Sequence, residues 1–244
     1  MKKIIIVLFT FLITGLNAQQ ISSTNLSAFD EAVRSSRIEM RKYCALVQQL
    51  IKAPDESKQQ EAVGHMIRTI ELWQEVNAFK TKIPREYQND ARFSSRIRQI
   101  EEKLIAMKVK LESAEYKESF ENCSAACSMF VKMHEDNGLV YAADRLFHLR
   151  KLAKKIIDED QQSGLNAIKE LMGNMLKLRD NVLLAPCPAV DDDTRCQKYQ
   201  TALKELSSLL DELAIRIIND RSAEAKLILG NLVSKINQAY ALAL

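Results

Sequence analysis

The sequence has little glycine and proline, with six glycines and four prolines in 244 residues. These residues supply the tight turns that sandwiches and barrels of short strands need, so their scarcity argues against an all-β fold. Alanine, leucine, isoleucine, lysine, glutamate and glutamine are common instead, and they lose little conformational freedom on entering a helix. The composition therefore predicts an all-α protein.

The sequence also lacks a large excess of charge of either sign. Lysine and arginine total 35, aspartate and glutamate total 32, and the formal net charge is +3. Domains that bind nucleic acid usually carry a strongly basic face, so we expect no nucleic-acid partner. Glycine-rich loops that cradle phosphate are absent as well.

Long apolar runs are missing except at the N-terminus, which reads MKKIIIVLFTFLITGLNAQQ. Two lysines precede a short apolar stretch, and small residues before Gln19 are typical of a signal-peptidase cleavage site. The apolar run is shorter than the ~20 residues that a membrane span needs. We interpret residues 1–18 as a signal peptide and expect no membrane span in the mature chain. A periplasmic or secreted location follows.

Apolar residues recur with helical spacing through nearly all of the remaining chain. The pattern predicts eight amphipathic helices, at 25–53, 55–82, 90–112, 114–136, 138–159, 162–185, 194–219 and 221–243. The seventh is the clearest, because its apolar residues alternate three and four apart, as in antiparallel bundles. The members of that seam are Cys196, Tyr199, Leu203, Leu206, Leu210, Leu213 and Ile217.

The two halves of the mature chain resemble each other. SAEYKESFENCSAACSMF from Ser113 aligns with SAEAKLILGNLVSKINQA from Ser222, at an offset of 109. We therefore expect two tandem up-down four-helix bundles, at 19–137 and 138–244, the second as a degenerate repeat of the first. A single elongated helical stack without a repeat is the alternative.

Five cysteines in an exported chain favour disulfides. Cys187 and Cys196 flank a proline-containing loop and are predicted to pair. Counting residues from the helix ends places Cys44 and Cys123 at nearly the same level in neighbouring helices, which favours that pair over Cys44 with Cys127. Cys127 is then the spare thiol, interpreted as a buried core residue because free cysteine packs like a small apolar side chain.

The stretch from 25 to 136, with its F-x-x-C-x-x-x-C-x-x-F segment at 120–130, resembles the cytochrome c′-type four-helix bundles in architecture. The resemblance implies a relative in fold, but the haem-attachment motif is not intact. The two cysteines are one residue too far apart, and Ser128 stands where the iron-binding histidine should be. His134 lies about 10 Å beyond Cys127 along a helix, too far to share its metal.

Other candidate residues have simpler interpretations. His65, His134 and His148 fall on different helices, and none has a recognisable nucleophile–base partner in the sequence. Arg92, Arg96 and Lys103 form a basic line near several glutamates, which is typical of a solvated face. Trp73 and Phe79 are expected in the core. The run at 191–193 is interpreted as N-terminal charge for the seventh helix rather than as a cation site.

These observations predict a non-catalytic binding or structural module that requires no cofactor. Its partner would be another protein or an apolar ligand, because long amphipathic helices offer apolar grooves. Two alternatives stay open. One is a divergent cytochrome c′-like redox or metal-binding protein that uses Cys44, Cys123 and Cys127. The other is a periplasmic chaperone or assembly factor.

Overall fold

A computed structural model describes residues 28–163, 165–188 and 192–244, and the signal-peptide prediction lies outside these ranges. The described part contains helices and no strand. The helices are α1 (Ala28–Lys52), α2 (Glu56–Asn77), α3 (Phe93–Glu112), α4 (Tyr116–Asp136), α5 (Ala142–Ser163), α6 (Leu165–Leu183), α7 (Asp193–Ile218) and α8 (Ser222–Ala243). The all-α prediction is confirmed. None of these helices has both the length and the hydropathy that crossing a membrane requires.

Three boundaries differ from the expected ones by four or five residues, and one of them is the end of the fifth helix, at Ser163 rather than 159. The second helix ends at Asn77 rather than near 82, and short 3-10 helices at Ala78–Lys80 and Arg85–Tyr87 follow it. Pro84 lies between them, without the N–H that an α-helix would require there. The fifth helix begins at Ala142 rather than 138, because the turn after α4 takes more residues than its apolar pattern suggests.

That turn is a Schellman motif centred on Gly138. The glycine has a φ of +70°, the left-handed conformation that side chains disfavour. Its N–H donates to the carbonyl of Glu135 at 3.1 Å, and the N–H of Leu139 donates to that of His134 at 2.9 Å. Both bonds satisfy carbonyls at the end of α4. The predicted helix end at Asn137-Gly138 is confirmed.

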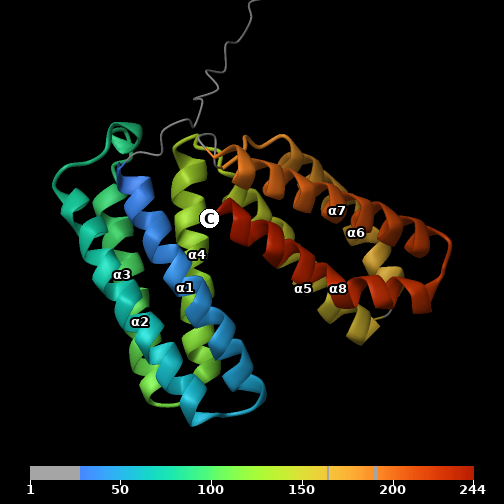
Figure 1. The fold of residues 1–244 in the computed structure, drawn as a ribbon, viewed down its shortest axis with the longest axis horizontal. Coiled ribbons are helices and arrows are strands. Elements are labelled where there is room, and N and C mark those ends of the chain that lie inside the picture. Colours follow the sequence, from blue (N-terminus) through green and yellow to red (C-terminus); the bar gives the residue numbers. More distant parts are fainter. Residues whose placement is uncertain (1–27, 164, 189–191) are drawn as a thin grey trace, which may run out of the picture.

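The helices form two groups of four, with their near ends together and their far ends apart (Figure 1). In the first group α1 packs on α2 and α4, and α3 packs on α2 and α4; in the second, α5 packs on α6 and α8, and α7 packs on α6 and α8. We call these the first and second helix groups. The arrangement is compatible with two tandem bundles, and the connection at 137–141 lies between them.

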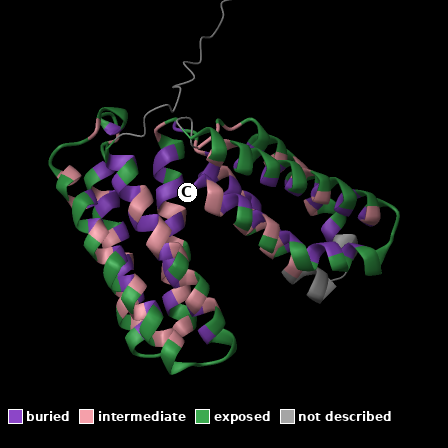
Figure 2. Cartoon of the chain, viewed as in Figure 1, coloured by how far each residue is buried: buried purple, intermediate pink, exposed green. Residues whose placement is uncertain are grey.

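Each group buries its apolar stripe between its own helices (Figure 2). In α7 the predicted seam residues from Tyr199 to Ile217 are at most 7% exposed. Trp73 is 1% exposed and packs edge-on against Phe130, with ring centroids 5.3 Å apart. Full burial of each such side chain contributes about 1.5–3 kcal/mol. The predicted seam and the predicted core position of Trp73 are confirmed.

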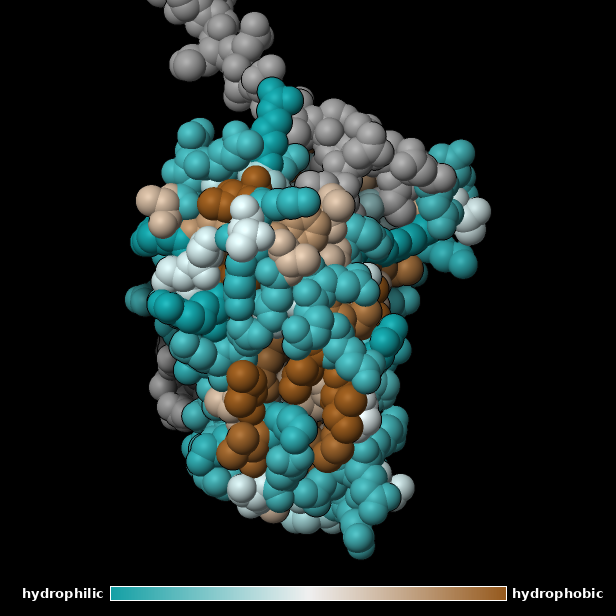
Figure 3. Space-filling view, turned by 90° about the vertical axis from the view of Figure 1, so that its left-hand side faces the viewer, coloured by the Kyte–Doolittle hydropathy of each residue, from teal (hydrophilic) through white to brown (hydrophobic). Residues whose placement is uncertain are grey.

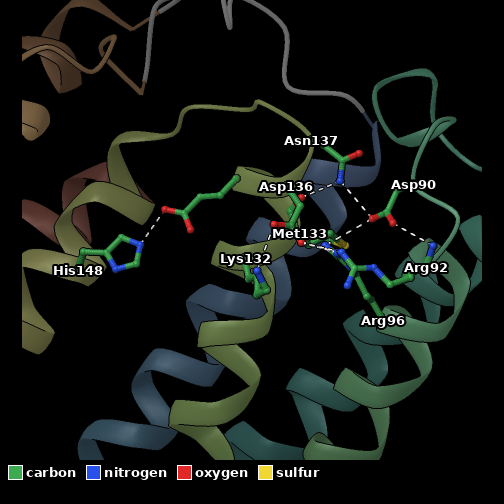
Figure 4. A network of polar contacts seen from close by, with 9 residues as sticks. Asp90, Arg92, Arg96, Lys132, Met133, Asp136, Asn137 and His148 are labelled. Atoms are coloured by element: carbon green, nitrogen blue, oxygen red, sulfur yellow. Dashed lines mark hydrogen bonds and ion pairs between the residues drawn. The ribbon is translucent and has the colours of Figure 1, made fainter.

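A polar network fixes the long connection between α2 and α3 to the end of α4 (Figure 4). Arg96 forms ion pairs with Asp90, at 3.4 Å, and with Asp136. Asn137 donates to Asp90 at 3.2 Å. The prediction of a solvated basic line is wrong for Arg96, which is only 8% exposed, because the connection folds back over it. It holds for Arg92, whose side chain is 67% exposed.

Candidate functional site

A cleft of about 390 Å³ lies where the two helix groups meet. Its walls are α1 and α4 of the first group and α5 and α8 of the second. Six of the lining side chains are cationic, and among the described residues no carboxylate lines the cleft. The six cations are Arg37, Arg41, Lys42, Arg150, Lys151 and Lys154. We call this cavity the basic cleft.

Helical spacing explains why these cations gather. Arg37 and Arg41 are four apart on α1, and Arg150 and Lys154 are four apart on α5. Residues four apart share one face of a helix. The two helices belong to different groups, and their basic faces meet at the junction. Lys42 is paired with Glu39 at 2.6 Å, so its charge is partly balanced outside the cleft.

Aromatic rings position two of the cations. The guanidinium carbon of Arg150 lies 4.8 Å from the ring centre of Tyr240 and 5.5 Å from that of Phe147. The ammonium of Lys154 lies 5.1 Å from the ring centre of Phe120. A cation near the face of an aromatic ring is attracted by the ring electrons, and Arg150 also donates to the Asn237 side chain at 3.4 Å. The rings therefore place these charges while adding apolar surface to the walls.

The first predicted disulfide forms part of the cleft wall. Cys44 on α1 and Cys123 on α4 are bonded, with Cα atoms 6.7 Å apart, and both line the cleft. Cys127, one turn further along α4, is a free and buried thiol, as predicted. Burial raises the pKa of the Cys127 thiol, although nearby Arg37 and Arg150 act in the opposite direction. The thiol is therefore protonated at neutral pH.

The second predicted disulfide joins Cys187 to Cys196, with Cα atoms 5.9 Å apart. It ties the α6–α7 connection to the start of α7. Asp192 caps that helix by accepting from the N–H of Arg195 at 2.9 Å, which confirms the role predicted for the acidic run. Asp191 of that run lies outside the described residues.

The residues present do not fit a covalently attached haem. Cys44 and Cys123 are bonded to each other, so two of the three thiols in the redox alternative are not available as ligands in this structure. Ser128, at the position of the expected histidine ligand, donates to the carbonyl of Ser124 at 2.9 Å within its own helix. Within the described ranges no group of three metal-ligating side chains converges.

A buried charge cluster lies behind the basic cleft and joins the two groups. Arg37 donates to Asp144 and to the Tyr240 hydroxyl, each at 3.1 Å. Asp144 also accepts from His134 Nδ1 at 2.5 Å. Arg37, His134 and Asp144 are each at most 5% exposed. Charges removed from water in this way are stable only when they are paired and hydrogen-bonded.

Asp30 completes the cluster from the first turn of α1. Its carboxylate lies 3.6 Å from His134 Nε2 and accepts from the hydroxyl of Tyr87 at 2.7 Å. Tyr141 donates to its other oxygen. Two carboxylates thus face one guanidinium and one imidazolium. The cluster has no net charge when His134 is protonated.

The surroundings keep all four groups charged. Burial alone would lower the pKa of His134, but the charges of Asp144 and Asp30 raise it to about 9. Burial would likewise raise the pKa of Asp144, yet His134 and Arg37 hold it at about 2. Burial would also raise the pKa of Asp30, but His134 and the hydroxyls of Tyr141 and Tyr87 together lower it. The cluster is therefore fully ionised at neutral pH.

Two nitrogens of the cluster form no hydrogen bond, and one of them, His134 Nε2, lies 3.6 Å from the Asp30 carboxylate. The other, Arg37 Nε, is fully buried, although the same side chain lines the basic cleft. A buried donor without an acceptor costs about 1–3 kcal/mol. Because its side chain also lines the cleft, Arg37 links the structural cluster to the open cavity.

Sequence reasoning missed this cluster. It treated His134 as an isolated histidine, whereas the structure places it between two carboxylates from α1 and α5. His65 and His148 instead form hydrogen bonds with Glu39, at 2.8 Å, and Glu135, at 2.9 Å. The position of His134 on the apolar seam of α4 was the one sign of this cluster in the sequence. No local pattern identifies the partners of His134.

Comparisons with known proteins identified no relative of this chain. No family model matches the chain, and no match was found among curated proteins or among solved structures.

Proposed function

We propose that this chain is an exported, non-catalytic binding protein that takes an anionic ligand into the basic cleft. The observation that carries the proposal is the one-sided charge of the cavity, whose described lining has cations from both helix groups and no carboxylate, although Arg37 is paired with Asp144 and Lys42 with Glu39 behind the walls. The chain as a whole is nearly neutral, at +3. Local segregation of charge on this scale raises the concentration of ligands of the opposite sign.

The walls also favour an apolar portion in the ligand. Met40, Phe120 and Phe147 line the cleft between the cations. Ligand sites combine apolar surface with a few placed polar groups that fix orientation. The sequence predicts an apolar ligand, and the cations of the cleft add a negative charge to that description. An organic anion would contact both the cations and the apolar side chains of the walls.

The test uses two dyes that share an aromatic body and differ in charge. The anionic probe is 8-anilinonaphthalene-1-sulfonate, and N-phenyl-1-naphthylamine is the same body without the sulfonate. We expect the sulfonate to bind at least about tenfold more tightly, because each charge-assisted hydrogen bond contributes about 1.5–3 kcal/mol. Binding is measured by fluorescence titration, and high salt should weaken it.

Matched variants locate the binding. Lys151→Gln combined with Lys154→Gln should weaken sulfonate binding about tenfold and leave the neutral dye nearly unchanged. The control, Arg98→Gln combined with Lys204→Gln, removes two exposed cations outside the cleft. Equal affinity for both dyes, or equal loss in both variants, would contradict the proposal.

Export is tested separately by the mass of the protein recovered from the host's periplasm. A chain that begins at Gln19 and lacks four hydrogens would carry both disulfides, which form in oxidising compartments. A mass that retains residues 1–18 would refute export with cleavage.

An exposed apolar face favours chaperone activity as a second candidate. Ile67 on α2 is 44% exposed, and Ile105 and Val109 on α3 are 54% and 52% exposed. Figure 3 shows apolar side chains gathered on the lower part of this side of the molecule. Such patches mark interaction sites in many proteins. Suppression of the aggregation of a reduced client, lost in Ile67→Ser combined with Ile105→Ser, would support this role.

A further inference from the structure

A second cavity adjoins the basic cleft and shares Arg41 with it. This cavity, of about 440 Å³, is lined by α1, the start of α7 and the end of α8. Its cations are Arg34, Arg41, Arg195 and Lys198, and Asp192 is the acidic residue in its lining. Because Asp192 accepts from the backbone at the start of α7, its charge already serves that helix.

Two cations of the second cavity, Arg34 and Arg195, are close enough to repel each other. Arg34 also donates to the main-chain oxygen of Leu244, which lines the same cavity. Burial lowers the pKa of Arg195, and the positive charge of Arg34 lowers it further. Glu31 pairs with Arg34 at 3.2 Å but is itself 53% exposed. Arg195 donates to the carbonyl of Leu242 at 3.1 Å, which fixes its guanidinium near the end of α8. The guanidinium groups of Arg34 and Arg195 are therefore held in fixed positions at this cavity.

The two cavities form one track along α1. Arg34 lines the second cavity, Arg41 lines both, and Gln48 lines the basic cleft. Fourteen positions separate Arg34 from Gln48, which at about 1.5 Å per residue gives a track of about 21 Å. An extended peptide rises about 3.3 Å per residue, so about six residues would fill it.

We propose that the occupant of this track is an acidic peptide segment of a partner protein, extended over about six residues with apolar side chains between its carboxylates. The inference rests on the proposed function and names its ligand class. Cations in both cavities match the carboxylates. Met40 and Phe147 match the apolar side chains, and the amides of Gln48 and Asn237 in the basic cleft can pair with peptide groups.

This combination distinguishes a peptide from a sulfated polysaccharide. A polysaccharide would use the cations but would offer no apolar side chain to the walls of the basic cleft.

The experiment measures peptide binding to the full mature chain by isothermal titration calorimetry. The probe is a capped hexapeptide of alternating glutamate and leucine, compared with the capped dipeptide and with a hexapeptide of alternating lysine and leucine. We expect the acidic hexapeptide to bind at least about tenfold more tightly than the dipeptide, because only the longer peptide reaches both cavities. The lysine peptide should not bind.

Variants in the second cavity separate this inference from the proposed function. Arg195→Gln with Lys198→Gln should weaken the hexapeptide about tenfold and leave sulfonate-dye binding in the basic cleft unchanged, which also verifies folding. Equal affinity for hexapeptide and dipeptide, or no effect of these variants, would overturn the extended peptide while leaving the basic cleft intact. Tighter binding of a heparin hexasaccharide than of the acidic peptide would overturn it in favour of a polysaccharide. If the unmodified protein does not bind the sulfonate dye at all, the proposed function itself is refuted.

Discussion

The junction between the helix groups should lose stability as the pH rises, through deprotonation of His134. The pKa of His134 is raised from 6.5 to about 9 by Asp144 and Asp30, against the opposing effect of burial. A pKa raised in the folded state stabilises the protein fully below about pH 6.5, and this contribution is lost as the pH rises through about 9. The difference corresponds to about 3 kcal/mol.

Between those values the free energy of unfolding should fall by about 1.4 kcal/mol for each pH unit, because the unfolded state binds one proton fewer. The physical event is the loss of the imidazolium that lies between two buried carboxylates, Asp30 and Asp144, of which Asp144 keeps its ion pair with Arg37. Tyr87 and Tyr141 also face Asp30, and burial raises the pKa of both hydroxyls. The measurement should therefore stop at about pH 9.5, before unfolded tyrosine ionises.

The assay is urea unfolding followed by circular dichroism at a series of pH values, with His134→Gln as the matched variant. Glutamine keeps one donor but cannot ionise. We expect the variant to be less stable at neutral pH and to lack the downward slope. A wild-type stability that does not fall over this range, or the same slope in both proteins, would refute the account. The pKa of His134, measured by NMR, provides an independent value.

Three further changes test the fold. Replacing Cys44 and Cys123 by alanine should lower the free energy of unfolding by about 4 kcal/mol, since the bond closes a loop with a sequence separation of 79; calorimetry under non-reducing conditions would show it. Asp55→Ala should cost about 1 kcal/mol in urea unfolding, because its side chain caps α2 by accepting from the N–H of Lys58 at 2.9 Å. Gly138→Ala should cost about 1–2 kcal/mol, because its φ of +70° is strained with a Cβ, although nothing obstructs the added atom. An unchanged melting temperature in any of the three would contradict the corresponding contact.

The positions of the helices, and the height of each residue along its helix, could be predicted from the sequence because both depend on short-range geometry. Helical periodicity located the helices, and a fixed rise per residue placed Cys44 level with Cys123. The same counting left Cys127 a turn away, where the structure has a free thiol. Each of these predictions needed only the direction of neighbouring helices and the spacing along them.

The charge cluster could not be predicted because it depends on how the two groups meet. Arg37, His134 and Asp144 come from α1, α4 and α5, and their convergence is set by the angle between the groups rather than by any local pattern. The prediction that Arg96 lies on a solvated face was wrong for a related reason. Its partner Asp90 lies in the irregular connection before α3, and the path of that connection has no periodic signature.

The predicted internal repeat shows another limit of periodicity. The turn between α3 and α4 is centred on Ala114, with a φ of +58°, and that between α7 and α8 on Asp220, with a φ of +55°. The two turns are 106 residues apart, whereas the sequence match has an offset of 109. An apolar seam with alternating three- and four-residue steps nearly maps onto itself when shifted by three residues. A match between two such seams therefore does not fix the offset, and the repeat stays a prediction.

The distribution of carboxylates explains how a nearly neutral chain can carry a strongly basic cleft. Asp30 and Asp144 are both at most 4% exposed and are used by the buried cluster, while Glu39 is taken by Lys42 and His65 on the outer side of α1. Acidic groups close to the junction thus bind the helices together instead of lining the cavity. The cations left there face low-dielectric walls, where their field is focused rather than screened. The packing that joins the two groups therefore also creates the electrostatic condition for capturing an anion.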